Sequence, residues 1–318
     1  MEKRKINDVL NVYPIKFQKP LLPVDAENIE IGEVIVKKLK SNGFEVKNRD
    51  ILVITSKMAS IFEGRTFELS KVSPSIKARF FAKIFKKDPK EMQLIFDEGK
   101  PLVIIPFKRV VKNKKLWSRL LELSIDHKGM EKALEISRFV FIVNNHAAFL
   151  DDAGIDFSNA REGYVTMLPA NPCHTAKRVR ESVKKLTDKD IAVVITDTVS
   201  LLGRMGSQDV AIGYSGIDPI TRKSGSADIF GKHHLGGNDC VIDSLAGIAG
   251  MMMGQTTEMT PMTLIRGYNY VEEEKDNEKC MDFIAYPKGT SFRSGFLSIV
   301  TTLWYHFLNV VTFWMPSK

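Results

Sequence analysis

The chain has 318 residues, 44% of them hydrophobic and 26% charged, which is typical of a globular protein with one or two domains. Lys and Arg outnumber Asp and Glu by 46 to 38, so the surface favours anionic partners, but no basic patch interleaved with aromatic residues supports nucleic-acid binding. The three cysteines, Cys173, Cys240 and Cys280, lack the spacing of a zinc site and predict no disulfide framework, which fits a reducing cytosol. No apolar stretch follows the charged N-terminus, so we expect no signal peptide and a cytoplasmic protein.

The first half of the chain predicts a mixture of helices and strands. Residues 12–24 contain three prolines and are predicted to be irregular. Helical spacing over residues 26–40 ends at Asn42-Gly43, and a strand is expected at residues 50–54. Further elements are helices at residues 73–87 and 88–97, the second with Asp88 as its N-cap, a strand at 102–106, and a partly helical, basic stretch at 110–137. The region 108–137 carries no chemical motif, and we interpret it as an insertion.

The second half contains the most apolar strand, at residues 191–195. The other predicted elements are a strand at 139–143, an acidic loop at 151–159, a loop at 168–172, a basic helix at 175–185, an apolar segment with glycines at 210–217, a polar loop at 225–237, an apolar helix at 240–253 and a strand at 262–265. No repeat or low-complexity segment occurs.

The C-terminal segment 296–315 is apolar and contains no Lys, Arg, Asp or Glu. Its length is sufficient to span a bilayer, but Trp304, His306 and Asn309 make it only moderately apolar. Two interpretations stay open at this point. The segment is either a helix that packs on the protein or at a dimer interface, or an anchor that brings the chain to a membrane.

The apolar strand ends in Thr196-Asp197-Thr198, which places a carboxylate and two hydroxyls where the chain leaves the core. Such hard oxygen ligands suit Mg²⁺ or Mn²⁺. The alternative is that Asp197 only caps the following turn. Upstream, Asp156 and Asn159 begin a turn of the acidic loop. If Asp156 and Asp197 converge, they could hold divalent ions that neutralise nucleotide phosphates.

Motifs of several enzyme classes are missing from the sequence. It has no P-loop, no convincing dinucleotide-binding Gly-x-Gly-x-x-Gly and no Gly-x-Ser-x-Gly nucleophile elbow. Four other blocks, in their order and spacing, resemble the coenzyme F420-0:L-glutamate ligase (gamma-glutamyl ligase) family over about residues 20–270. These blocks are Asp50-Ile-Leu-Val-Ile-Thr-Ser-Lys57 with Ser60 and Glu63-Gly-Arg65; Ala153-Gly-Ile-Asp156-x-Ser-Asn159; Ile195-Thr-Asp197-Thr198 followed by Val210-Ala-Ile-Gly213; and Met253-Gly-Gln255 before Arg266-Gly267.

This resemblance implies an α+β fold with mixed sheets and flanking helices, usually in a homodimer. Residues 1–20 would be an N-terminal extension, 21–270 the ligase domain and 271–318 a C-terminal extension. The implied enzyme is a ligase in which GTP phosphorylates a carboxylate of F420-0, and the amine of L-glutamate then displaces phosphate. Two sites for Mg²⁺ or Mn²⁺ are implied, and K⁺ is a further candidate cofactor.

The resemblance also assigns residues to these roles, although it identifies no catalytic residue. Asp156 and Asp197 would bind one divalent ion, and Thr198 and Gln255 a second, although Gln255 alone could simply be a polar residue after a helix. Lys57 and Arg204 are candidates for the substrate side. The implied nucleotide-binding residues are Leu21, Leu22, Pro23, Val24, Thr55, Ser56, Asn159, Met253, Gly254, Gln255, Thr256, Thr257, Glu258, Met259 and Thr260.

Three positions depart from the family pattern. Ile61 stands where the family usually has a Lys, residues 199–202 replace a Gly-Arg-Pro sequence, and Asp152 stands where Asn is common. Two alternatives therefore stay open. One is the same chemistry on another carboxylate cofactor of pterin or folate type, and the other is a nucleotide-binding protein without catalysis.

Overall fold

The computed structural model describes residues 9–26, 29–201, 204–273 and 280–283, together with Leu297, Val300, Thr301, Leu303, Trp304 and Phe307. The chain divides into two units, residues 1–281 and 282–318, and the first contains the central sheet and its helices. Most of the apolar segment predicted at 296–315 lies outside the described residues. Among the residues that are described, no helix has both the length and the apolar character needed to cross a membrane.

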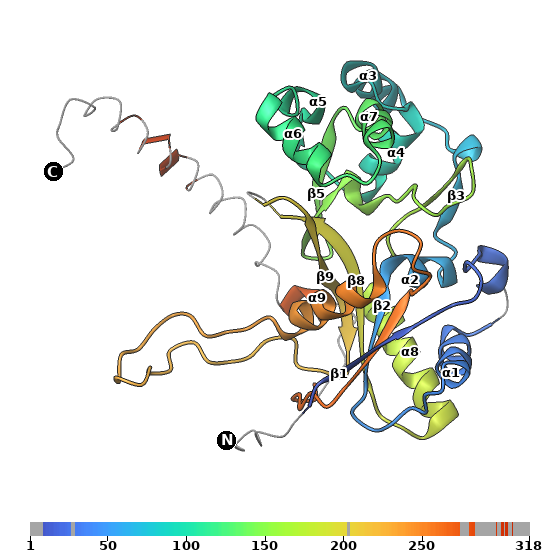
Figure 1. Cartoon of the computed structure of the whole chain (residues 1–318), viewed down its shortest axis with the longest axis vertical. Coiled ribbons are helices and arrows are strands. Elements are labelled where there is room, and N and C mark those ends of the chain that lie inside the picture. Colours follow the sequence, from blue (N-terminus) through green and yellow to red (C-terminus); the bar gives the residue numbers. More distant parts are fainter. Residues whose placement is uncertain are drawn as a thin grey trace. The chain divides into compact units, whose positions relative to one another are not determined.

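A five-stranded sheet forms the centre of the first unit (Figure 1). Its buried strands follow from their sequences, because continuous apolar runs such as Ile51–Thr55 need cover on both faces. Neighbouring strands are antiparallel, except that β2 and β8 run parallel. The strands, in their order across the sheet, are β1 (Asn11–Ile15), β10 (Met262–Arg266), β2 (Ile51–Thr55), β8 (Ala192–Ser200) and β9 (Ser207–Ser215).

Helices cover both faces of this sheet. Helices α1 (Ile31–Ser41) and α8 (Pro172–Thr187) lie together on one face, and α9 (Val241–Met253) lies on the other (Figure 1). Helix α8 buries Ala176, Val179 and Val183, which fall on one side at helical spacing. The core of the protein therefore lies on either side of β2 and β8, and it holds the ends of these two strands in place.

A second group of elements forms its own core beside a three-stranded sheet, ordered β4-β5-β6. Helices α3 and α4 pack on β5, where Ala82, Met92 and Phe141 are buried. We call residues 69–138 the helical lobe. The lobe contains α3 (Ile76–Phe85), α4 (Pro89–Glu98), β4 (Pro101–Ile105), α5 (Phe107–Val110), α6 (Lys114–Glu122) and α7 (His127–Ile136), and it is followed in the chain by β5 (Val140–Asn145) and β6 (Ala148–Asp151).

Short elements connect these layers, among them α2, which starts directly after β2. The remaining elements are η1 (Pro23–Ala26), α2 (Ser56–Phe62), β3 (Thr66–Glu68), η2 (Leu69–Lys71), η3 (Asp152–Gly154), β7 (Tyr164–Thr166) and η4 (Cys280–Phe283). Strands β3 and β7 pair with each other in a two-stranded sheet.

The predicted α+β fold with mixed sheets and flanking helices is confirmed. Asp88 caps α4 as predicted, since its Oδ1 accepts a hydrogen bond of 2.7 Å from Lys90 N. The prediction of an irregular segment at 12–24 is wrong, because Asn11–Ile15 forms strand β1. Pro14 is tolerated there because β1 lies at the edge of the sheet, where an N–H is not needed on the outer side. The helix predicted from residue 26 begins at Ile31.

The expectation that the cysteines form no disulfide is also wrong. Cys173, in the first turn of α8, is bonded to Cys280 in η4. The two are 107 positions apart in sequence, so only the tertiary fold shows that they meet. The Tyr214 hydroxyl of β9 donates to the Cys280 carbonyl at 3.1 Å. Cys240 is free, and burial raises the pKa of its thiol to about 12.

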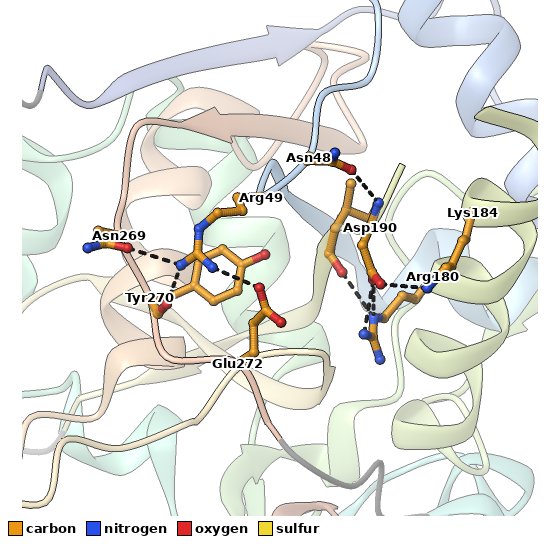
Figure 2. Close-up of polar contacts among 9 residues, drawn as sticks. Asn48, Arg49, Arg180, Lys184, Asp190, Asn269, Tyr270 and Glu272 are labelled. Carbon is orange, nitrogen blue, oxygen red and sulfur yellow. Dashed lines mark hydrogen bonds and ion pairs between the residues drawn. The ribbon is translucent and has the colours of Figure 1, made fainter. Parts of the chain in front are cut away.

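A polar cluster surrounds the start of β8 (Figure 2). The carboxylate of Asp190 accepts hydrogen bonds from Arg180 Nε at 3.1 Å and from Lys184 Nζ at 2.7 Å. Its backbone N–H donates to Asn48 Oδ1 at 2.9 Å, and its carbonyl accepts from Arg49 N at 2.8 Å. These contacts fasten α8 and the chain before β2 to the amino end of β8.

Arg49 connects the same end of the sheet to the segment after β10 (Figure 2). Its guanidinium donates to Asn269 Oδ1 at 3.1 Å and forms an ion pair with Glu272 at 2.7 Å. It also lies over the ring of Tyr270, with 4.5 Å between Cζ and the ring centroid. Arg49 therefore contacts three residues of the segment that follows β10.

Candidate functional site

The parallel pairing of β2 and β8 brings the carboxyl end of β2 beside Thr196 and Asp197, which lie in the second half of β8. Thr55 lies opposite Thr196 in the register, so the next residue of each chain segment, Ser56 and Asp197, are neighbours. Ser56 Oγ donates to Asp197 Oδ1 at 3.0 Å. Thr196 turns away, because its hydroxyl donates to the Val210 carbonyl at 2.9 Å. The edge where parallel strands end is a common place for ligands in sheets of this kind.

Asp197 is the most perturbed carboxylate of this edge. Burial raises its pKa to about 7, since the surrounding protein atoms remove much of the water around the carboxylate. The negative charges of Asp156 and Asp209 raise this pKa further, whereas hydrogen bonds from the Thr198 backbone and from Ser56 lower it. The structure thus brings Asp156 and Asp197 close enough for their charges to interact.

Asp156 is held by its backbone and by both carboxylate oxygens. It forms an antiparallel bridge with Thr166, with N–O distances of 2.9 and 3.0 Å. Its Oδ1 accepts from Ser158 N at 2.7 Å, and its Oδ2 forms an ion pair with Lys57 Nζ at 2.5 Å. Lys57 therefore places a cation directly beside the predicted metal-binding carboxylate.

Thr198 and Gln255 meet through a residue that the sequence analysis missed, Asp209. Thr198 lies opposite Asp209 in the β8–β9 register, and its hydroxyl donates to Asp209 Oδ1 at 2.7 Å. Gln255 Nε2 donates to the same oxygen at 3.1 Å, while Gln255 Oε1 lies 3.1 Å from Thr198 Oγ1. Asp209 is 6% exposed. Gly250 of α9 makes room for it, because a Cβ there would lie 2.6 Å from Asp209 Cγ.

The predicted nucleotide-binding residues come from separate segments that lie around the start of α2. Asn159 Nδ2 donates to the Thr256 carbonyl at 2.9 Å, which joins the acidic loop to the loop after α9. Thr55 N donates to the Pro261 carbonyl at 3.0 Å, and η1 packs against α2. Within the loop after α9, Thr256 N donates to Glu258 Oε2 at 2.8 Å.

Glu63 and Arg65, from the first sequence block, form hydrogen bonds with residues of the loop at 168–171 and the start of α8. Glu63 accepts a hydrogen bond from Ala170 N at 2.7 Å and another from the hydroxyl of Thr175. Arg65 Nε donates to the Leu168 carbonyl at 2.9 Å. These contacts fix the loop at 168–171 against α2, so the role of the two side chains in this structure is to position that loop.

The departures from the family pattern occupy ordinary structural positions. Ile61 is buried near the end of α2. Asp152 accepts from Phe141 N at 3.0 Å and pairs with the buried Lys87 at 3.0 Å, contacts that its charge favours. Arg204 is exposed between β8 and β9, and among the described residues no hydrogen bond or ion pair joins its guanidinium to the site.

Comparison with known proteins matches the same segments. The family described as F420-0:Gamma-glutamyl ligase matches residues 22–267. A protein of Methanocaldococcus jannaschii is 30% identical over 84% of this chain and 90% of its own length. Proteins of Methanothermobacter thermautotrophicus and Methanopyrus kandleri are 28% and 27% identical, over 78% and 89% of this chain and 86% and 98% of theirs. All three are named Coenzyme F420:L-glutamate ligase.

Proposed function

The chain belongs to the F420-0:gamma-glutamyl ligase family, and from this we propose that it is a GTP-dependent ligase that adds L-glutamate to the carboxylate of coenzyme F420-0. Membership confirms the resemblance that the four sequence blocks indicated. The single observation that carries the proposal is the gathering of Asp156, Asp197, Thr198 and Gln255 beside the carboxyl end of β2, in the second half of β8 and in the neighbouring loops.

The proposed reaction has two steps. First, a carboxylate oxygen of F420-0 forms a bond to the γ-phosphorus of GTP, and the bond to the β–γ bridging oxygen breaks, which releases GDP. Second, the amine nitrogen of L-glutamate bonds to the carbonyl carbon of the acyl phosphate, the bond from this carbon to the phosphate oxygen breaks, inorganic phosphate leaves, and the nitrogen loses its proton to water. Phosphorylation is needed because a carboxylate is a poor electrophile. The protein's task is mainly to position the reactants and to neutralise charge.

The donor set fits a hard divalent cation. Carboxylate, hydroxyl and amide oxygens are the ligands that Mg²⁺ and Mn²⁺ prefer. Within the described part of the chain, no three His, Cys, Asp or Glu side chains form a metal site by themselves. We propose that Asp156 and Asp197 would hold one ion and that Thr198 and Gln255 would hold a second. Because each pair offers few ligands alone, oxygens of the nucleotide would complete each coordination shell. Such ions, when bound, neutralise the phosphate charge. K⁺ follows from the resemblance alone, and we assign it no residue.

The chain's own residues prepare this site. Asp209 accepts from both Thr198 and Gln255 and so holds their oxygens 3.1 Å apart. Lys57 neutralises Asp156, and we propose that it is also the cation that faces phosphate, since the family's lysine is replaced by the buried Ile61. Arg204 is a weaker candidate for the substrate side because it lies in an exposed loop.

A coupled assay tests the proposal. Purified protein is incubated with Mg²⁺ or Mn²⁺, with GTP or ATP, and with L-glutamate, in the presence and absence of F420-0. Phosphate release that depends on F420-0, together with a product one glutamyl residue heavier by mass spectrometry, supports the ligase. Nucleotide hydrolysis with a pterin- or folate-type acid instead supports the same chemistry on that substrate. Nucleotide binding without any product supports the non-catalytic alternative, which the loss of the family's lysine at Ile61 favours.

The homodimer is a separate proposal. It rests on the family alone, and light scattering on the purified full chain measures it directly. A mass of one chain at the concentrations of the assay would contradict it.

A further inference from the structure

Helix α3 turns an apolar row away from the protein. Ile76, Phe80 and Ile84 follow one another at a spacing of four residues and are 88%, 61% and 52% exposed. The opposite side of the helix, with Ala78 and Ala82, is buried in the lobe's core. Since the apolar row of a surface helix normally faces the core, a second row that faces outward indicates a surface that meets another phase or molecule.

The residues that flank this row are basic. The stretch from residue 72 to 87 contains five Lys or Arg and no Asp or Glu. Lys77, Arg79, Lys83 and Lys86 are exposed, and within the described residues none of these four forms an ion pair with a carboxylate. The fifth, Lys87, is the exception, since it pairs with Asp152 and is buried. The exposed face of α3 is therefore apolar along its middle and positive along its sides.

The helical lobe as a whole carries the basic excess of the protein. Residues 69–138 contain 17 Lys or Arg and 8 Asp or Glu, which is a net charge of +9, whereas the rest of the chain contains 29 and 30, a net charge of −1. Figure 1 shows α3 on the outer side of this lobe, away from the central sheet. A positive field concentrated in one lobe draws that lobe, and not the rest of the protein, towards an anionic surface.

We propose that α3 docks the protein on the surface of an anionic lipid bilayer. Ile76, Phe80 and Ile84 would enter the boundary between headgroups and acyl chains, and the flanking basic side chains would contact acidic headgroups. This occupant accounts for both observations, because a bilayer surface offers an apolar phase beside negative charge. Nucleic acid would account for the charge but gives the two isoleucines no apolar environment. The inference is independent of the reaction that the site catalyses.

The test measures binding of the full chain to vesicles by co-sedimentation. One set of vesicles is pure phosphatidylcholine, and the other contains about 30 mol% phosphatidylglycerol as the anionic lipid. We expect the protein to bind the anionic vesicles at least about 10-fold more tightly than the neutral ones, and raised salt to weaken this binding. Equal or absent binding to the two kinds of vesicle would overturn the proposal.

Two variants and a matched control locate the contact. Replacing Ile76, Phe80 and Ile84 by Ser should weaken binding to anionic vesicles about 10-fold or more, and so should replacing Lys77, Arg79 and Lys83 by Gln. The control replaces Ile229, Phe230 and Leu235 by Ser. These three are 92%, 87% and 94% exposed in the loop between β9 and α9, and their loss should leave binding unchanged.

The remaining outcomes decide against α3. If both α3 variants bind as the wild type does, another surface, such as the apolar segment at 296–315, is responsible. If duplex DNA binds as tightly as the anionic vesicles, and only the Gln variant loses it, the lobe binds nucleic acid instead. All the substituted side chains are exposed, so each variant should keep the melting temperature of the wild type, which is measured alongside.

Discussion

Two carboxylates, one near each end of strand β8, have pKa values that are shifted in opposite directions. At the amino end, hydrogen bonds from Lys184 and the charge of Arg180 lower the pKa of Asp190 (Figure 2). At the other end, seven residues later in the sequence, burial and the charges of Asp156 and Asp209 raise the pKa of Asp197 to about 7. Both residues lie close to the same apolar run, at residues 191–195, so the difference comes from the neighbouring elements that surround each carboxylate.

This contrast separates a structural end of the strand from the end that we propose to be functional. Opposite charges at the amino end satisfy each other and fasten three segments together. At the carboxyl end, Lys57 pairs with Asp156, but burial and the charges of Asp156 and Asp209 still disfavour the ionised form of Asp197. Strongly perturbed carboxylates of this kind are typical of functional sites. Four changes test whether the two ends really differ in this way.

The largest effect is expected for Asp197→Asn. It should reduce kcat/KM for ligation by about 100- to 1000-fold or more, because the group that would hold a cation loses its charge.

The same substitution tests the raised pKa of Asp197. Since this pKa is raised from 3.8 to about 7, Asp197 in the folded metal-free protein keeps its proton at pH values between these two, where the unfolded chain has released it. The contribution of Asp197 to wild-type stability should therefore decrease as pH rises from about 4 to about 7, so the stability of the wild type relative to the variant should fall over this range. Urea unfolding at a series of pH values measures it, and equal slopes would contradict the assignment.

The next largest effect is expected for Cys280→Ser, which removes the disulfide between η4 and α8. Loss of the disulfide to Cys173 should lower the free energy of unfolding by about 2–4 kcal/mol. Cys240→Ser is the matched control, because Cys240 is free and should leave the free energy nearly unchanged. Thermal unfolding with and without reductant compares the three proteins. Identical melting temperatures for both variants would show that the disulfide contributes nothing.

A smaller effect is expected for Asp209→Asn at the functional end. The Asn side chain keeps one acceptor for Thr198 and Gln255 but removes the charge that strengthens both hydrogen bonds. We expect Mn²⁺ to bind about 10- to 100-fold more weakly, as for other residues that orient metal ligands. Electron paramagnetic resonance, with Mn²⁺ titrated in the presence of GTP, measures the Mn²⁺ affinity without turnover. Gln208→Ala, one residue earlier and exposed, should bind Mn²⁺ as the wild type does.

The smallest effect is expected for Asp190→Asn. Its carboxylate is partly exposed, so the ion pairs with Arg180 and Lys184 are screened by water, and their loss should cost about 1 kcal/mol of stability. Ligation should stay within about twofold of the wild type. A variant with wild-type stability but much lower activity would contradict the assignment of a structural role to Asp190.

Local sequence patterns were sufficient for the elements that depend on local physics. The apolar run before Asp197 predicted the buried strand β8, and Asp88 followed by proline predicted the start of α4. Strand β1 was missed because Pro14 is acceptable only at a sheet edge, and a sequence does not show which strand lies at the edge. Asp209 was missed because its importance depends on the β8–β9 register. The bond between Cys173 and Cys280 depends in the same way on tertiary contact.

The order of the strands has a consequence for how the chain is made. Strand β10 lies between β1 and β2, yet residues 262–266 are synthesised more than 200 residues after both of its partners. On the ribosome, β2 can pair with β8 once residue 200 has emerged, but its other edge stays open until β10 follows. Open apolar edges recruit other chains. A nascent chain that stalls before Met262 should therefore aggregate, so this protein depends on the completion of translation more than its compact central sheet suggests.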